Sequence, residues 1–338
     1  MITDMKNLLY LFASVMLLSS CERLFMDENP ETTPKEIFEQ AWTFADQEYS
    51  FFGFKNIDWN EVYKEFEPRI SNEMTDEELF DEIADMLYLL RDGHVNLRSS
   101  FNRSRNWTWY LNAPDNYDKY VLERNYFKEE QQIVGPFIVY DFNDVGYMAY
   151  ESFSSGFSAE HLDYILNTFQ DKKGIIIDIR NNFGGALNNV YRIGQRFVSA
   201  STTVARRRDK NGPGHEDFTE FVDMIFEYNE DQVHFTKPVV ILTNRKSYSA
   251  GNFFPTLMSE LDNVTVMGDV TGGGGGAPSF TELSNGWSLR VSTTQLYTMD
   301  GVNTEDGLEP DVRVDISPED EAAGIDTILE EALKLLRS

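Results

Sequence analysis

A serine lies where a buried strand is followed by a helix. Residues 239–242 are continuously apolar and mostly β-branched, which predicts a parallel strand covered on both faces. Apolar residues recur between 253 and 258, so Ser249 is expected at the N-terminus of the next helix. There its hydroxyl could act as a nucleophile while free backbone N–H groups bind a developing oxyanion. The alternative is that Ser249 only caps the helix, as serine often does.

Two other segments carry residues that could serve such a nucleophile. Residues 174–179 predict a second buried strand, and Gly184 and Gly185 follow it, where glycine allows a positive φ and a close ligand approach. His94 comes just after a predicted helix that ends near Gly93. Imidazole has an ordinary pKa near 6.5 and can accept the proton of a serine. Taken singly, the glycines could form an ordinary loop and the histidine a helix cap.

Five motifs in one order resemble a known family. They are Asp92-Gly93-His94, DIRNNFGG at 178–185, SYSA at 247–250, MGDVTG at 267–272 and EDGLEPD at 305–311. Together they resemble the serine peptidases that include the C-terminal (tail-specific) processing proteases and the tricorn core protease, over about residues 35 to 315. The resemblance implies an α/β fold with a ClpP/crotonase-like core, a β-spiral with flanking helices, preceded by a small N-terminal helical domain. It also implies hydrolysis of peptide bonds through an acyl-enzyme on Ser249.

The general base predicted for this chain is a histidine. Processing proteases use a lysine in the glycine-rich stretch beyond the serine, but no lysine occurs here between Lys246 and Lys334. The tricorn-like branch uses a histidine and a glutamate, and the matching positions are His94 and Glu305. The resemblance therefore implies that His94 is the base and Glu305 the carboxylate that orients it, which would also shift the imidazole pKa upward. Tricorn-like enzymes have a serine just before the histidine, where this chain has Gly93.

The oxyanion hole and the cofactor requirement follow from the same comparison. The backbone N–H groups of Gly185 and Ala250 are the candidates for the oxyanion hole, with Gly184 as the alternative to its neighbour. The chemistry needs no cofactor, and the remaining histidines, 161, 215 and 234, are scattered without metal-ligand spacing, so no metal is predicted.

The N-terminus predicts export. An apolar run from residue 8 to residue 18 is too short to span a bilayer and is followed by Ser19, Ser20 and Cys21. This pattern resembles a bacterial lipobox, in which Cys21 is lipidated after residues 1–20 are removed as a lipoprotein signal peptide. The expected location is the cell envelope, periplasmic or on the outer surface. An ordinary signal peptide with an incidental cysteine is the alternative.

The rest of the chain divides into an acidic tether at 21–32, an N-terminal helical domain at 33–98 and a peptidase core at 99–338. Capping boxes at Thr33 with Glu36 and at Thr75 with Glu78 predict two helix starts. Residues 137–150 alternate as a hairpin. The interval between His94 and this hairpin is too short for the PDZ domain that processing proteases commonly carry there, which makes tail specificity doubtful.

The charge and composition of the chain limit the classes of binding partner that are expected. The 338 residues include 57 acidic and 29 basic side chains, a net charge of −28, which argues against nucleic acid and against electrostatic attachment to anionic lipid. The expected partners are a peptide or unfolded protein as substrate, and a membrane through the lipid anchor alone. A second hypothesis is a non-catalytic ligand-binding or peptide-binding lipoprotein that reuses the fold.

Overall fold

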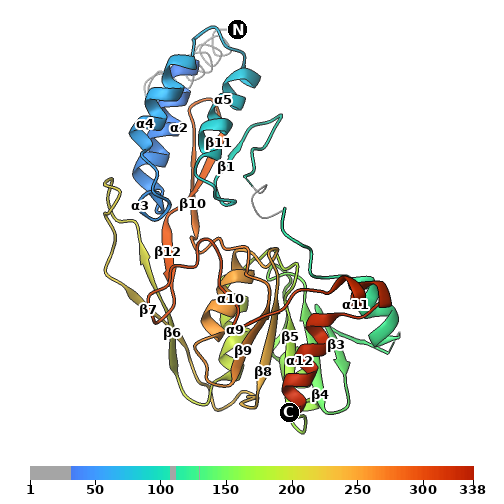
Figure 1. Cartoon of the computed structure of the whole chain (residues 1–338). Coiled ribbons are helices and arrows are strands. Elements are labelled where there is room, and N and C mark those ends of the chain that lie inside the picture. The colour runs from blue at the N-terminus through green and yellow to red at the C-terminus, as the bar shows by residue number, and fades with distance from the viewer. Residues whose placement is uncertain (1–31, 107–111, 129) are drawn as a thin grey trace, which may run out of the picture.

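A computed structural model describes residues 32–106, 112–128 and 130–338 (Figure 1). Four helices lie at the start of the described residues, at α2 (Pro34–Glu48), α3 (Phe52–Lys55), α4 (Trp59–Phe66) and α5 (Asp76–Tyr88), with a 3₁₀ turn at Glu67–Arg69. Both predicted capping boxes are confirmed, since the Thr33 and Thr75 side chains accept from the N–H of Glu36 and Glu78. Within the described residues, no helix is long and apolar enough to cross a membrane.

A small sheet, formed by strands within residues 96–98 and 278–292, packs on these helices. The helices and this sheet together are called the helical unit. The sheet contains β1 (Asn96–Arg98), β10 (Pro278–Glu282) and β11 (Ser288–Ser292), in the order β1-β11-β10 and with antiparallel pairing. Leu97 and Leu289 pack with Trp287 and Val291 against the apolar faces of α2 and α5, in one buried cluster. Figure 1 shows β10 and β11 reaching up among the helices. The predicted unit at 33–98 therefore shares its core with residues 283–291.

A seven-stranded sheet is the centre of the larger unit. Its order is β13-β9-β8-β5-β4-β3-β2, parallel from β13 to β4 and antiparallel beyond. The strands are β2 (Gln132–Val134), β3 (Phe137–Asp141), β4 (Val145–Tyr150), β5 (Gly174–Asp178), β8 (Val239–Thr243), β9 (Val264–Gly268) and β13 (Val312–Arg313). The two predicted buried strands and the hairpin are confirmed. The predicted alternation is wrong for β4, whose six residues are all buried because the sheet is covered on both faces.

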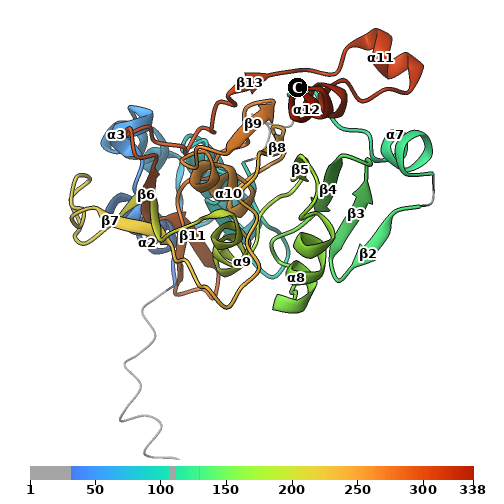
Figure 2. The ribbon, with the colours of Figure 1, turned by 90° about the horizontal axis from the view of Figure 1, so that it is seen from below.

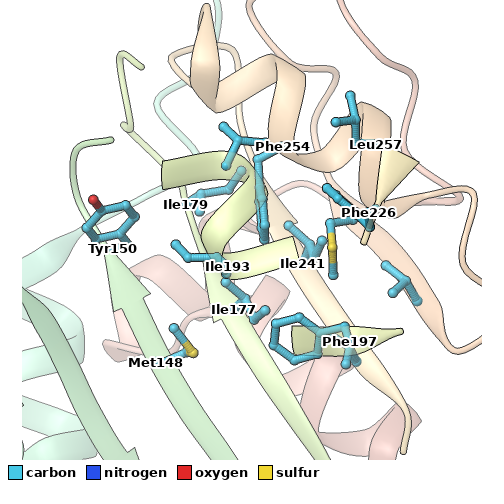
Figure 3. Close-up of a cluster of buried hydrophobic side chains, with 14 of the residues drawn as sticks. Met148, Tyr150, Ile177, Ile179, Ile193, Phe197, Phe226, Ile241, Phe254 and Leu257 are labelled. Atoms are coloured by element: carbon cyan, nitrogen blue, oxygen red, sulfur yellow. The ribbon is translucent and has the colours of Figure 1, made fainter. Parts of the chain in front are cut away.

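Helices cover the two faces of this sheet (Figure 2). One face packs on α8 (Ala159–Thr168), α9 (Leu187–Gly194) and α10 (Ala250–Met258), and the other on α12 (Thr327–Arg337). Successive residues of β5 and β8 point to opposite faces: Ile177 and Ile241 join the first cluster (Figure 3), and Ile176 and Val240 join the second. This double burial accounts for the unbroken apolar runs in the sequence.

The remaining elements flank these two sheets. A second three-stranded sheet has the order β12-β6-β7, with β6 (Thr202–Asp209), β7 (Val222–Phe226) and β12 (Thr294–Tyr297). The other helical turns are α7 (Lys119–Val121), a π-helical turn at Leu122–Phe127, a 3₁₀ turn at Gln195–Phe197, and α11 (Pro318–Ala323). The α/β core preceded by a helical segment agrees with the predicted fold class.

Candidate active site

Ser249 lies at the turn between β8 and α10, as predicted. Its φ of 57° and ψ of −121° form a conformation that side-chain-bearing residues rarely adopt and that costs free energy to hold. Three backbone hydrogen bonds hold it: Ser249 N donates to the carbonyl of Gly273 at 2.9 Å, and its own carbonyl accepts from Asn252 and Phe253 at 2.8 Å. The Ser249 hydroxyl makes no capping hydrogen bond to α10, so the alternative role of helix cap is not adopted. The side chain is half-buried.

The neighbouring Ser247 has a different environment. It is fully buried, and its Oγ donates to the carbonyl of Ile179 at 2.9 Å and accepts from the N–H of Asn244 at 3.1 Å. These bonds tie the turn after β8 to the end of β5. Ser247 therefore holds the turn together, and its hydroxyl is occupied.

His94 comes to Ser249 from the other unit. Its Nε2 lies 2.9 Å from Ser249 Oγ although the two residues are 155 positions apart. The backbone around the ring is fixed on both sides, because His94 N donates to Asp92 Oδ1 at 2.7 Å and the His94 carbonyl accepts from Arg290 Nε at 2.9 Å. Asp92 is itself held by the Ser292 hydroxyl at 2.7 Å. The junction of the helical unit with its small sheet thus sets the position of the imidazole.

The pKa of His94 is shifted in the direction opposite to the one predicted. Burial lowers the pKa of His94 to about 4, and this effect exceeds the opposing charge of Asp92, while Arg290 lowers the pKa further. The backbone at Gly276 acts upward, in the same direction as Asp92. The ring is therefore neutral at pH 7, which is the protonation state that can accept a proton from a serine.

Glu305 pairs with Lys55, which was not predicted as a site residue from the sequence. Its Oε1 accepts from Lys55 Nζ at 2.8 Å, and both side chains are 2% exposed. The same ammonium donates to the carbonyls of Leu90 and Arg91 at 3.2 and 3.0 Å. Burial raises the pKa of Glu305 to about 8, with Asp92 acting in the same direction and Lys55 opposing it. Lys55 therefore stabilises the charged form of this carboxylate.

The predicted contact between Glu305 and the His94 ring is not formed. No hydrogen bond or ion pair joins these two side chains, and Glu305 Oε2 is buried without a hydrogen-bond partner among the described residues. The carboxylate is turned toward Lys55 because the ammonium is the strongest charged partner within its reach. In this structure the acidic residue bonded to the histidine segment is Asp92, which holds the backbone and not the ring.

The glycine loop after β5 lies against the serine turn. A side-chain carbon on Gly184 would come within 2.8 Å of Ser249 Cβ and of Ala250 N, so this position admits only glycine. The Gly184 N–H is already used, since it donates to Asn182 Oδ1 at 2.9 Å. The assignment of Gly185 and Ala250 as oxyanion donors stays a prediction.

Two other predictions concern a metal site and the lipidated cysteine. Among residues 32–106, 112–128 and 130–338, no three His, Cys, Asp or Glu side chains are grouped so that they could hold a metal ion. Cys21 lies outside the described residues.

The sequence is similar to known peptidases. The model of Peptidase family S41 matches residues 144–314, and that of the Tricorn protease C1 domain matches residues 30–88. The carboxy-terminal processing protease CtpA of Bacillus subtilis is 26% identical over 177 residues, which are 52% of this chain and 36% of that protein. The chain thus aligns with less than half the length of this curated relative.

Solved structures match over more of the chain. A crystal structure of a candidate peptidase from Parabacteroides merdae is 40% identical, with a TM-score of 0.87, and covers 91% of this chain and 98% of its own. The tricorn protease shares the fold at 14% identity, with a TM-score of 0.57, over 90% of this chain and 37% of its own. Both the helical segment and the α/β core are therefore present in known structures.

Proposed function

The chain belongs to peptidase family S41, whose members are serine peptidases, and on that basis we propose that it hydrolyses peptide bonds through an acyl-enzyme on Ser249 with His94 as general base. The observation that carries this proposal is the 2.9 Å contact between His94 Nε2 and Ser249 Oγ. A serine hydroxyl is a weak nucleophile until a base within hydrogen-bonding reach takes its proton. A neutral imidazole at this distance supplies that base.

The proposed reaction proceeds in two halves. His94 Nε2 takes the hydroxyl proton as Ser249 Oγ bonds to the carbonyl carbon of the substrate, and the N–H groups of Gly185 and Ala250 stabilise the oxyanion. The imidazolium then gives its proton to the leaving amine as the peptide C–N bond breaks. In the second half a water molecule gives a proton to His94 Nε2 as its oxygen bonds to the acyl carbon, and the imidazolium returns that proton to Ser249 Oγ as the ester C–O bond breaks, which releases the acid.

Lys55 and Glu305 have a supporting role in this proposal. The chain has the histidine and the glutamate of the tricorn-like branch, at His94 and Glu305. In this proposal Glu305 supports the site through its buried ion pair with Lys55 and not through the His94 ring. This pair joins the helical unit to the loop after the glycine run, where Gly274 N donates to the Glu305 carbonyl at 2.9 Å. Removing either partner would leave the other buried polar group without this hydrogen bond, which is destabilising. The substrate proposed is a peptide or an unfolded protein.

A fluorophosphonate probe tests the proposed nucleophile directly. The probe should label the folded protein, and peptide mapping should place the adduct on Ser249, because a serine that is activated by a neutral imidazole attacks phosphorus readily. Protein unfolded in denaturant is the matched control and should not react. Folded protein that stays unlabelled, or an adduct on another serine, would contradict the proposal.

We also propose that the protein is an exported lipoprotein anchored through Cys21, because a short apolar run is followed by Leu18, Ser19 and Ser20 before that cysteine. In a bacterium with lipoprotein processing, the protein should partition into detergent and its mature N-terminus should be a lipid-bearing Cys21. Cys21→Ala should be released or left unprocessed, whereas Ser20→Ala, which keeps a small residue before the cysteine, should remain anchored. A mature N-terminus at another residue, found by mass spectrometry without a lipid adduct, would rule out this assignment.

A further inference from the structure

One face of the small sheet carries a cluster of arginines next to the proposed catalytic pair. Arg98 lies opposite Ser288, which is two positions before Arg290 on the same strand, and Arg103 forms an antiparallel bridge with Arg98. Directly opposed residues point to the same face of a sheet, and diagonal neighbours lie about 7–8 Å apart. Arg98, Arg103 and Arg290 therefore share one face, and we call this set the arginine face.

The opposite face of the same strands is apolar. Leu97 and Leu289 are completely buried in the core of the helical unit, and Ser104, next to Arg103, is buried on that side, where its hydroxyl accepts from Leu97 N at 2.8 Å. Arg98 and Arg103 are exposed, and Arg290 is partly buried. The alternation of the strands thus directs Arg98 and Arg103 outward, while Arg290 on the same face turns its Nε to the His94 carbonyl.

The arginine face is positively charged, whereas the chain as a whole has a large negative net charge. The chain has 57 acidic side chains against 29 basic ones, yet within the described residues no Asp or Glu oxygen lies within ion-pairing distance of Arg98, Arg103 or Arg290. Burial lowers the pKa of Arg290, and the nearby charges of Arg103 and Arg105 lower it further against the opposing effects of Tyr248 and Asp92. Mutual repulsion of this kind is relieved when an anion binds between the guanidinium groups.

The position of the face links it to the reaction. Arg290 Nε donates to the His94 carbonyl at 2.9 Å, and His94 Nε2 lies at the same distance from Ser249 Oγ. Phe280 on β10 lies opposite Arg290 and is 78% exposed, so it offers an apolar contact beside the charges. Arg98 follows His94 by four residues, so the arginine face begins on the segment that carries the proposed base.

We propose that the arginine face binds a carboxylate of the substrate peptide, on an Asp or Glu side chain or at the C-terminus, and so selects acidic peptides for cleavage. This inference rests on the proposed peptidase activity. Guanidinium groups pair with carboxylates through two parallel hydrogen bonds, which gives both affinity and orientation. The strongly negative remainder of the surface repels acidic peptides, so the arginine face provides the local field that brings such a peptide to the site.

Matched peptides with one cleavage sequence would measure this selectivity. Four peptides combine Glu or Gln side chains near the scissile bond with a free or an amidated C-terminus, so that the two sources of carboxylate are separated. At low salt the native protein should cleave either the Glu peptides or the peptides with a free C-terminus with a kcat/KM about tenfold above that of the matching Gln or amidated peptides. This ratio of kcat/KM values should fall as the salt concentration increases. Equal kcat/KM values for all four peptides would overturn the inference.

Two double variants with the same loss of charge isolate the arginine face. Arg98→Gln with Arg103→Gln should bring the acidic-to-neutral ratio close to one, with an unchanged thermal midpoint to show that the fold is kept. Arg69→Gln with Arg206→Gln removes two exposed arginines from other surfaces and should keep the ratio. If the first pair keeps the native ratio, the inference is wrong.

A binding assay separates this inference from the proposed function. Ser249→Ala protein should bind a labelled acidic peptide more tightly than its neutral partner, as measured by fluorescence anisotropy, whether or not any peptide is cleaved. Absence of hydrolysis by the native protein together with this preference would contradict the proposed function and support the arginine face. Binding of anionic lipid vesicles that is lost in the first double variant, without any peptide preference, would assign the face to the membrane instead.

Discussion

Ser249→Ala should abolish the hydrolysis of unfolded peptides. The loss in kcat is expected to be about 10⁴ to 10⁶-fold, because the variant retains the binding surface and the oxyanion donors but has no atom to form the acyl-enzyme. The thermal midpoint should change by only a few degrees, since the Ser249 hydroxyl is half-buried and its hydrogen bond is to His94 alone. Steady-state kinetics and thermal unfolding of the same preparation measure both quantities.

Ser247→Ala is the matched control, since it removes the same atom two positions away. The Ser247 hydroxyl bonds to the carbonyl of Ile179 and the N–H of Asn244 in a fully buried site, so its loss should cost about 1–3 kcal/mol of stability. The folded fraction should still hydrolyse peptides. An active Ser249→Ala together with an inactive Ser247→Ala would reverse the assignment of the nucleophile.

The elements that hold Ser249 could be predicted because their sequence signals are local. A strand of a parallel sheet with helices on both faces must be apolar at every position, and residues 239–242 meet that condition. The start of a helix is indicated by its capping residues, as at Thr33 with Glu36. The approach of His94 to Ser249 has no local signal, and it was predicted only from the order of motifs shared with a family.

The environment of His94 could not be predicted from the sequence. A carboxylate near the histidine can be guessed from a motif, but burial of the ring depends on residues far along the chain, such as Tyr248, whose ring centroid lies 4.9 Å from that of His94. Desolvation exceeds the charge of Asp92 in setting the pKa of His94, so the predicted direction was wrong. The pairing of β1 with β11 that creates the arginine face is equally non-local, since it joins residues 96–98 to residues 288–290.

The partner of Glu305 could not be predicted for a similar reason. Lys55 is the last residue of α3, where a lysine would ordinarily be a solvent-exposed side chain at a helix end. Its burial against Glu305, 250 positions later, depends on the docking of the helical unit against the loop that contains Glu305.

Glu305→Gln should therefore lower the thermal midpoint. It should reduce kcat less than the loss of His94 does, because the Glu305 side chain makes no bond to the His94 ring.

His94→Ala should reduce kcat by about 10⁴-fold or more, because Ser249 then has no base within hydrogen-bonding distance. His161→Ala is the control, since that histidine lies on α8 and its Nδ1 accepts only from the N–H of Ser158, outside the proposed site. The control should retain native kcat. Near-native turnover by His94→Ala, on a peptide that the native protein cleaves, would contradict the role of His94 as base.

The pH dependence of kcat/KM tests the same base without a substitution. The neutral ring is the active form, and burial lowers the pKa of His94 to about 4, so activity should be present at neutral pH and should be lost only as the pH falls through that value. A histidine whose pKa was raised by an adjacent carboxylate would instead lose activity as the pH falls through a value above 6.5. Because kcat/KM reports ionisations of the free enzyme, an inflection above pH 6.5 would show that the ring is stabilised as imidazolium before the substrate binds, contrary to the geometry described here.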